Sequence, residues 1–232
     1  MKKVILFVSL FFAILSNSYS QEGLVFQLFQ NPDVPNGQVR TILAHGDTVF
    51  VGGSFYFWGP PIGPFGVFDT LTGDVDLNMF RVIRVGNYGI TKLIPDNSGG
   101  FYMCSGGGFI EIMEKSGTIR KFNGILHVNS DGSIDLNFNP PPITSSRNDY
   151  NNLLLVDTIL FAVGNFTKIG DSIRTYIAAF DARTGRILPW KTDSIVTGFI
   201  GIRSIAIIDT ILIVGGDIQK VGDSTRNGIA AF

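Results

Sequence analysis

Short apolar runs separated by brief polar breaks follow one another along the chain from residue 37 to its end. They come in pairs, and each run is four to seven residues long, which is the length of a strand rather than of a helix. The polar break within each pair suits a tight turn, so each pair predicts an antiparallel hairpin. The four pairs are 39–44 with 49–53, 88–94 with 101–104, 152–156 with 159–163, and 202–208 with 211–215.

Two of these hairpins lead into a turn of the form Asp-x-x-Thr-Gly, from Asp69 to Gly73 and from Asp181 to Gly185. The aspartate can accept hydrogen bonds from backbone N–H groups ahead of it, and the glycine tolerates the positive φ that ends such a turn. A further apolar segment follows at 75–80, 134–138 and 187–190. Each unit therefore predicts four short antiparallel strands within roughly 50 residues.

The chain repeats itself. Residues 157–180 return 52 residues later as 209–232, with 14 of 24 aligned positions identical. Four glycines are taken as equivalent places in the copies: Gly53, Gly107, Gly164 and Gly216. A second glycine follows six residues later in three copies: Gly59, Gly170 and Gly222. Such self-similarity indicates units that bury their apolar faces against one another.

We therefore expect an all-β fold, a β-propeller built of four-stranded antiparallel blades. About four blades are present and the ring is expected to be incomplete, with blades at approximately 37–80, 81–140, 141–192 and 193–232. The last copy stops at Phe232, where its turn should begin, which favours a piece of a larger ring. The alternative is a small closed ring in which residues 23–29 supply the missing strand of the last blade.

Several motifs recur in order. They are apolar-Gly-Gly-x-Phe-x-x-x-Gly, then Arg-x-x-Ile-Ala-Ala-Phe-Asp-x-x-Thr-Gly-x-Leu-x-x-Trp, together with HVNSDGSIDLNFNP at 127–140. Over residues 37–232 the chain resembles the delta-60 repeat family of secreted bacterial β-propeller-like proteins. The resemblance implies an extracytoplasmic or cell-surface propeller, and it brings no catalytic residues with it.

The N-terminus predicts export. Lys2 and Lys3 precede an apolar run at 4–15, and small residues stand at Ser18 and Ser20. This is the pattern of a signal peptide over 1–20, cleaved before Gln21. The run is shorter than the roughly 20 residues that span a bilayer, so no transmembrane segment is expected in the mature chain. Residues 21–36 would form an N-terminal strand and linker, and the protein would be secreted or held at the cell surface.

Charge, cysteine and histidine content argue against several classes of partner and ligand. Without residues 1–20 the chain has 16 basic and 19 acidic residues, a balance that offers no stripe for nucleic acid. Cys104 is the single cysteine, so no internal disulfide is possible. His45 and His127 stand in different copies without a carboxylate or thiol at ligand spacing, and no metal site or cofactor is expected. Residues 131–137 are interpreted as a hairpin turn rather than as a calcium loop.

No catalytic residue is expected. Gly170-Asp171-Ser172 looks like a hydrolase motif, but Gly222-Asp223-Ser224 repeats it one unit later, and a nucleophile would not recur in each copy. The nearby arginines, Arg174 and Arg226, are expected to bind carbonyls or carboxylates of the adjacent loop.

Two segments depart from the repeat. In the first copy an aromatic, proline-rich loop at 56–65 includes Tyr56 and Trp58, which could stack on a sugar or a proline-rich partner; these rings could instead fill the seam between blades. In the second copy residues 111–121 add a charged hairpin. The favoured function is an interaction module for a protein or glycan. A structural surface or matrix component is the first alternative, and a hydrolase or quinoprotein-like enzyme is the second.

Overall fold

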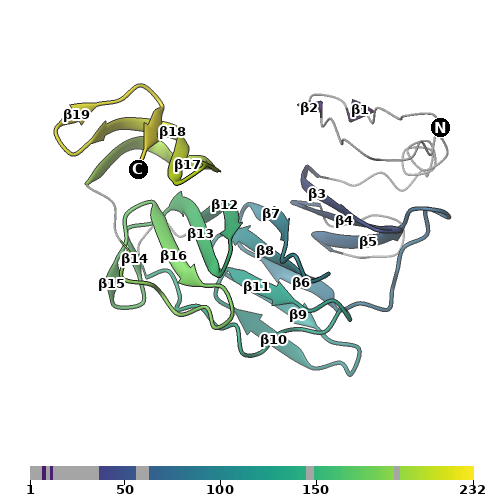
Figure 1. Cartoon of the computed structure of the whole chain (residues 1–232). Helices are drawn as coiled ribbons and strands as arrows, with labels where there is room; N and C mark the ends of the chain where they lie inside the picture. Colours follow the sequence, from purple (N-terminus) through teal and green to yellow (C-terminus); the bar gives the residue numbers. More distant parts are fainter. Residues whose placement is uncertain (1–6, 9–10, 13–36, 56–62, 145–148, 191–193) are drawn as a thin grey trace.

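The computed structural model describes residues 7–8, 11–12, 37–55, 63–144, 149–190 and 194–232 (Figure 1). All regular structure in these ranges is β-strand, paired antiparallel, which confirms the all-β class. Within the same ranges, no helix has the length and apolar character needed to cross a membrane.

Four units of three antiparallel strands follow one another along the chain. Unit 1 consists of β3 (Val39–His45), β4 (Thr48–Gly53) and β5 (Phe65–Asp69), and unit 2 of β7 (Gly89–Pro95), β8 (Phe101–Gly106) and β11 (Ile125–Val128). Unit 3 consists of β12 (Asp149–Val156), β13 (Ile159–Asn165) and β16 (Ile177–Asp181). Unit 4 consists of β17 (Ile195–Ile208), β18 (Ile211–Val221) and β20 (Ile229–Ala231). In each unit the second strand lies between the first and the third.

The remaining strands are short. They are β1 (Phe7–Val8), β2 (Phe11–Phe12), β6 (Arg81–Val85), β9 (Ile110–Met113), β10 (Ile119–Phe122), β14 (Lys168–Ile169), β15 (Ser172–Ile173) and β19 (Ser224–Thr225). β9 and β10 form the hairpin predicted for residues 111–121, and β6 pairs with the other edge of β9.

The fourth strand predicted for each of the first three units is present only as a single bridged pair. The pairs are Phe68 with Val75, Val128 with Ile134, and Phe180 with Ile187. In units 1 and 2 an aspartate follows the bridge and its carboxylate accepts the backbone N–H two residues ahead, which turns the chain away from the sheet. In unit 3 Pro189 follows and has no N–H to offer to a ladder. Each of these units therefore has three regular strands and one bridge at the edge, and a single pair between Asp149 and Gly106 joins units 2 and 3 into one sheet.

The turn between the third strand and this bridge is built as the Asp-x-x-Thr-Gly pattern suggests. The carboxylate of Asp181 accepts the Thr184 N–H at 2.8 Å and the Thr184 hydroxyl at 2.7 Å, and that of Asp69 accepts two backbone N–H groups at 2.8 Å. Gly73 and Gly185 have φ angles of 76° and 72°, a region that favours glycine.

The strand register shows which residues take equivalent places in the four units. Gly53, Gly164 and Gly216 each face the residue before a bulge in the first strand, and each donates its N–H to the carbonyl that precedes the third strand. In unit 2 this place belongs to Ser105, which faces Ile90 and donates to Gly124. The predicted frame through Gly107 was wrong by two residues. Three consecutive glycines at 106–108 offered several alignments, and only the bulge decides among them.

Gly170 and Gly222 occupy matching turns. Their φ angles are 53° and 54°, and each lies between two strand segments that pair as a short hairpin. Gly59 lies outside the described residues.

Each pair of neighbouring units shares an apolar core. Phe50 and Phe65 of unit 1 pack with Phe101 and Met103 of unit 2. Ile94 and Cys104 of unit 2 pack with Tyr150, Leu160 and Phe180 of unit 3. Phe161 and Val163 of unit 3 pack with Leu212 and Val214 of unit 4. The fold is therefore stabilised at seams between units, as stacked repeats require.

The first strands of successive units are joined by side chains near the bulge. The Thr41 hydroxyl accepts the Leu93 N–H at 3.0 Å, and the Thr91 hydroxyl donates to the Tyr150 carbonyl at 2.7 Å. The Asn151 amide donates to the Ile202 carbonyl at 2.8 Å. In Figure 1 the units follow one another along an arc, with units 1 and 4 at its two ends.

Candidate functional site

The predicted binding residues Tyr56 and Trp58 lie outside the described residues. Both ends of their loop are anchored in the core, because Phe55 before it and Phe65 at its end are almost completely buried. Pro64 adds a backbone link, since its carbonyl accepts the N–H of Gly53 at 3.0 Å. The loop thus begins and ends at fixed points of unit 1.

The same connection, from the second to the third strand, is elaborated in every unit. In unit 2 it carries the hairpin of β9 and β10, in unit 3 that of β14 and β15, and in unit 4 that of the end of β18 with β19. The connections of units 1 and 2 differ from each other and from those of units 3 and 4 in sequence, whereas units 3 and 4 share one short hairpin.

The unit 2 hairpin is the most highly charged of these connections. Arg84 on β6 lies 3.0 Å from Glu111, and Arg120 pairs with Glu114. The Lys121 ammonium lies 4.8 Å from the centre of the Phe109 ring, and the Arg84 guanidinium lies 5.6 Å from it. Two cations therefore frame one aromatic ring at the base of the hairpin, in the range of cation–π attraction.

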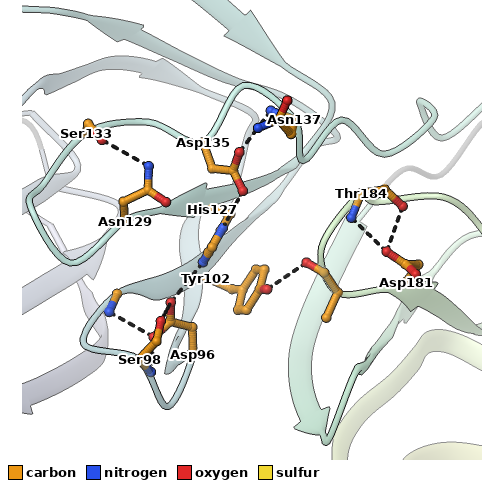
Figure 2. Close-up of polar contacts among 12 residues, drawn as sticks. Asp96, Ser98, Tyr102, His127, Asn129, Ser133, Asp135, Asn137, Asp181 and Thr184 are labelled. Atoms are coloured by element: carbon orange, nitrogen blue, oxygen red, sulfur yellow. Dashed lines mark hydrogen bonds and ion pairs between the residues drawn. The ribbon is translucent and has the colours of Figure 1, made fainter.

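A second polar cluster lies at the seam between units 2 and 3. His127 on β11 is held between two carboxylates: its Nδ1 lies 2.9 Å from Asp135 and its Nε2 lies 3.1 Å from Asp96 (Figure 2). Its ring stacks on Tyr102 with centroids 4.3 Å apart. The Tyr102 hydroxyl donates to the Ala182 carbonyl of unit 3 at 2.7 Å.

The two carboxylates are stabilised in their charged form. Burial alone would raise the pKa of Asp96, but hydrogen bonds from Ser98, His127 and Gly100 outweigh burial and hold the pKa below its ordinary value. The pKa of Asp135 is lowered in the same way, with His127 and the Asn137 N–H opposing burial. Burial and the nearby carboxylates raise the pKa of Tyr102 to about 12, so this hydroxyl remains a donor.

The cluster is built to hold the fold together rather than to bind a metal or transfer a proton. A histidine that acts as a ligand or a base needs a free ring nitrogen, and both nitrogens of His127 face a carboxylate. Among the described residues, no group of three or more His, Cys, Asp or Glu could hold a metal ion. The cluster joins the first turn, third strand and bridge segment of unit 2, and its Tyr102 reaches unit 3.

Sequence spacing could not find this cluster, because Asp96 lies 31 residues from His127. One signal was present in the repeat itself. The strand register puts His127 where units 1, 3 and 4 have Val67, Ala179 and Ala231. A histidine at a place that is otherwise apolar needs polar partners if it is to be buried.

The two Gly-Asp-Ser motifs lie in matching hairpins, with Ser172 on β15 and Ser224 on β19. The two arginines that follow differ in surroundings. Arg174 is buried and donates to the carbonyls of Ile173 and Leu188 at 2.8 and 2.7 Å. Arg226 is exposed and donates to the Thr225 carbonyl at 3.1 Å. Arg174 thus ties its hairpin to the segment that follows the unit 3 bridge.

Replacing Arg174 with alanine should lower the free energy of unfolding by about 2 kcal/mol, because two carbonyls lose a charged donor. Arg226→Ala is the matched control at the same repeat position, and it should change stability by less than about 0.5 kcal/mol. Urea unfolding of the two variants measures both values. Equal losses would show that the Leu188 contact contributes nothing.

No protein-family model matches the chain, and no curated protein matches it. Similar solved structures include the computationally designed Ika4 protein, at 15% identity and a TM-score of 0.41, covering 85% of this chain and 91% of that one. The computationally designed Ika8 protein has 15% identity and a TM-score of 0.30, covering 78% of this chain and 70% of that one. YjhT has 15% identity and a TM-score of 0.38, covering 79% of this chain and 58% of that one.

Proposed function

We propose that the chain is an exported β-propeller-type scaffold of the delta-60 kind that binds a protein or a glycan at the cell surface or outside the cell. The observation that carries the proposal is the contrast within each unit. The three strands, the bulge and the seams recur, whereas the connection from the second to the third strand has one form in unit 1, another in unit 2 and a third that units 3 and 4 share. Residues 1–20 would act as the signal peptide.

A repeated framework with one variable connection is the usual design of a binding scaffold. The framework supplies rigidity through buried seams, and the loops supply recognition at little cost to the fold. The stacking of successive units through their first strands supports a propeller arrangement. The proposal involves binding without turnover.

The unit 1 loop is the strongest candidate for ligand contact. Its sequence combines Tyr56 and Trp58 with prolines at 60, 61 and 64, and its ends are anchored by Phe55 and Phe65. Prolines and fixed ends reduce the conformational entropy that the loop would lose on binding. Flat aromatic rings on such a loop suit the faces of sugars or a proline-rich segment.

The double substitution Tyr56→Ala with Trp58→Ala should weaken binding at least tenfold while leaving the melting temperature nearly unchanged. The probe is a glycan array, followed by calorimetric titration of the glycan that the unmodified protein binds best. Tyr88→Ala removes an exposed aromatic ring outside this loop and should leave binding intact.

The opposite result would assign the two rings to the seam. In that case the double variant would keep its affinity but lose stability, by about 3 to 5 kcal/mol for a buried tryptophan alone.

A further inference from the structure

The hairpin of unit 2 has an open strand edge. Strands β10, β9 and β6 form a three-stranded sheet with β9 in the middle, so β10 and β6 are its two edges. Among the described strands, β10 pairs with β9 alone. Figure 1 shows β10 at the lower margin of the molecule, beyond β9. The N–H and C=O groups on the outer side of such a strand are a template on which another strand can pair.

The ladder between β9 and β10 shows which backbone groups lie on that outer side. Beside the turn, the Glu114 N–H donates to the Thr118 carbonyl at 2.9 Å, so these two residues form a hydrogen-bonded pair. Hydrogen-bonded and non-hydrogen-bonded pairs alternate along an antiparallel ladder, so Arg120 also bonds to β9. Ile119 and Lys121 lie in the non-hydrogen-bonded pairs. Their N–H and C=O groups therefore point away from β9, toward the open edge.

The face of this sheet that is turned away from the core is basic. The other face packs into the core, where Ile110 and Ile112 of β9 are completely buried. Because side chains alternate along a strand, Glu111 and Met113 face outward. The register puts Lys121 and Arg84 beside Glu111, and Ile119 and Arg81 beside Met113. The outer face therefore combines three cations and one carboxylate with apolar side chains such as Ile119, which is 61% exposed.

This part of the chain carries positive charge although the whole chain is slightly acidic. Residues 81–85 and 109–121 contain five of the chain's 18 basic residues and only two of its 19 acidic ones, a net charge of +3. The remaining residues have a net charge of −4. Both acidic residues of the region are already in ion pairs, Glu111 with Arg84 and Glu114 with Arg120. The region is therefore complementary to an acidic partner.

The same charges decide what kind of strand can pair with β10. A second copy of this edge would bring Arg120 and Lys121 close to like charges, which opposes pairing between identical edges. An acidic segment in extended conformation meets opposite charge instead. A peptide, unlike a glycan, also repeats N–H and C=O groups at the spacing of the edge. Charge and backbone together favour an acidic peptide.

We propose that the open edge of β10 binds an acidic, extended segment of another protein, which adds to the sheet as a further antiparallel strand. The segment places an acidic side chain opposite Lys121 and an apolar side chain opposite Ile119, so these two side chains lie two residues apart in its sequence. The edge belongs to unit 2, and the inference does not depend on what the unit 1 loop binds.

A synthetic peptide of sequence Thr-Glu-Thr-Val-Thr-Glu-Thr tests the proposal, with its binding to the purified protein measured by fluorescence anisotropy. It should bind about tenfold more tightly than the peptide that has lysine in place of each glutamate. No binding of the glutamate peptide at millimolar concentration, or equal binding of the two peptides, would overturn the proposal. Displacement of the peptide by polygalacturonate at the same carboxylate concentration would also overturn it, because the edge would then recognise an acidic glycan.

Methylation of the peptide's backbone nitrogens separates strand addition from simple attraction between charges. In the proposed antiparallel pair, the glutamate and valine that face Lys121 and Ile119 exchange hydrogen bonds with them. N-methyl groups on the glutamates and the valine should therefore weaken binding about tenfold, whereas N-methyl groups on the threonines should weaken it less than about threefold. Equal affinities of the two methylated peptides would contradict strand addition.

A charge reversal at the edge tests where the peptide binds. Lys121→Glu places a carboxylate opposite the peptide's glutamate and should weaken binding about fivefold. Lys115→Glu makes the same change of net charge in the turn between β9 and β10, outside the open edge, and should weaken binding less than about twofold. Equal losses in the two variants would show that net charge rather than the edge attracts the peptide, which would overturn the proposal.

The loop variant keeps this test apart from that of the proposed function. Tyr56→Ala with Trp58→Ala leaves β10 unchanged and should bind the glutamate peptide as the unmodified protein does. Glycan binding that fails while peptide binding holds would reject the role of the unit 1 loop alone. Peptide binding that fails while glycan binding holds would reject the role of the β10 edge alone.

Discussion

Replacing His127 with alanine is expected to lower the free energy of unfolding by about 3 kcal/mol, because removing one partner of a buried ionic group leaves the others without compensation. The carboxylates of Asp96 and Asp135 are largely buried, and each would lose the ring nitrogen that lies about 3 Å away. Tyr102 would also lose the ring on which it stacks. Chemical denaturation at neutral pH measures the loss.

His45→Ala is the control, because His45 is an exposed histidine of unit 1 and its removal should change little. His127→Gln should recover part of the lost stability, since its amide can donate to one of the two carboxylates. If His127→Ala lowered the free energy of unfolding as little as His45→Ala, the cluster would contribute nothing to the stability of the seam.

The loss should also depend on pH. The pKa values of Asp96 and Asp135 are lowered in the folded protein, so their contribution to stability is complete above the ordinary aspartate pKa of 3.8 and disappears as the pH falls below it. In His127→Ala the two carboxylates lose their partner and protonate more easily. The difference in stability between the variant and the unmodified protein should therefore narrow in acid, and a constant difference from pH 7 to pH 3 would contradict this account.

Gly164→Ala is expected to lower the free energy of unfolding by about 3 kcal/mol, which is at the upper end of the usual loss when a core is overpacked. A β-carbon at this place would lie 1.9 Å from the Asp149 carbonyl oxygen and 2.9 Å from its carbon. These are backbone atoms of the neighbouring strand β12, so the clash cannot be relieved by turning a side chain. Thermal unfolding monitored by circular dichroism measures the effect.

Ser105→Ala is the matched control because Ser105 has the same place in the unit 2 register. It removes one hydrogen bond, from the Ser105 hydroxyl to the Phe109 carbonyl, and should cost about 1 kcal/mol. A larger loss at Ser105 than at Gly164 would show that the two residues do not share one role in the repeat.

The hairpins of all four units could be predicted from the sequence because they depend on local signals. Apolar runs with a short polar break form a strand, a turn and a strand wherever they stand, and Asp181 and Gly185 build their turn from residues within one loop. The fourth strands could not be predicted in the same way. Apolar residues such as Ile134 and Ile187 were present, but the aspartate turn or the proline after the bridge ended the pairing.

The sequence by itself determined the all-β class, the four repeated units and the turns, since periodicity and turn chemistry act within a few residues. Only the tertiary structure decided that Ser105 rather than Gly107 takes the glycine's place, that His127 meets Asp96, and that Arg174 is buried where Arg226 is exposed. These facts depend on strand register and on which face a neighbouring unit covers. Both arise from contacts between residues far apart in the chain, which no local pattern records.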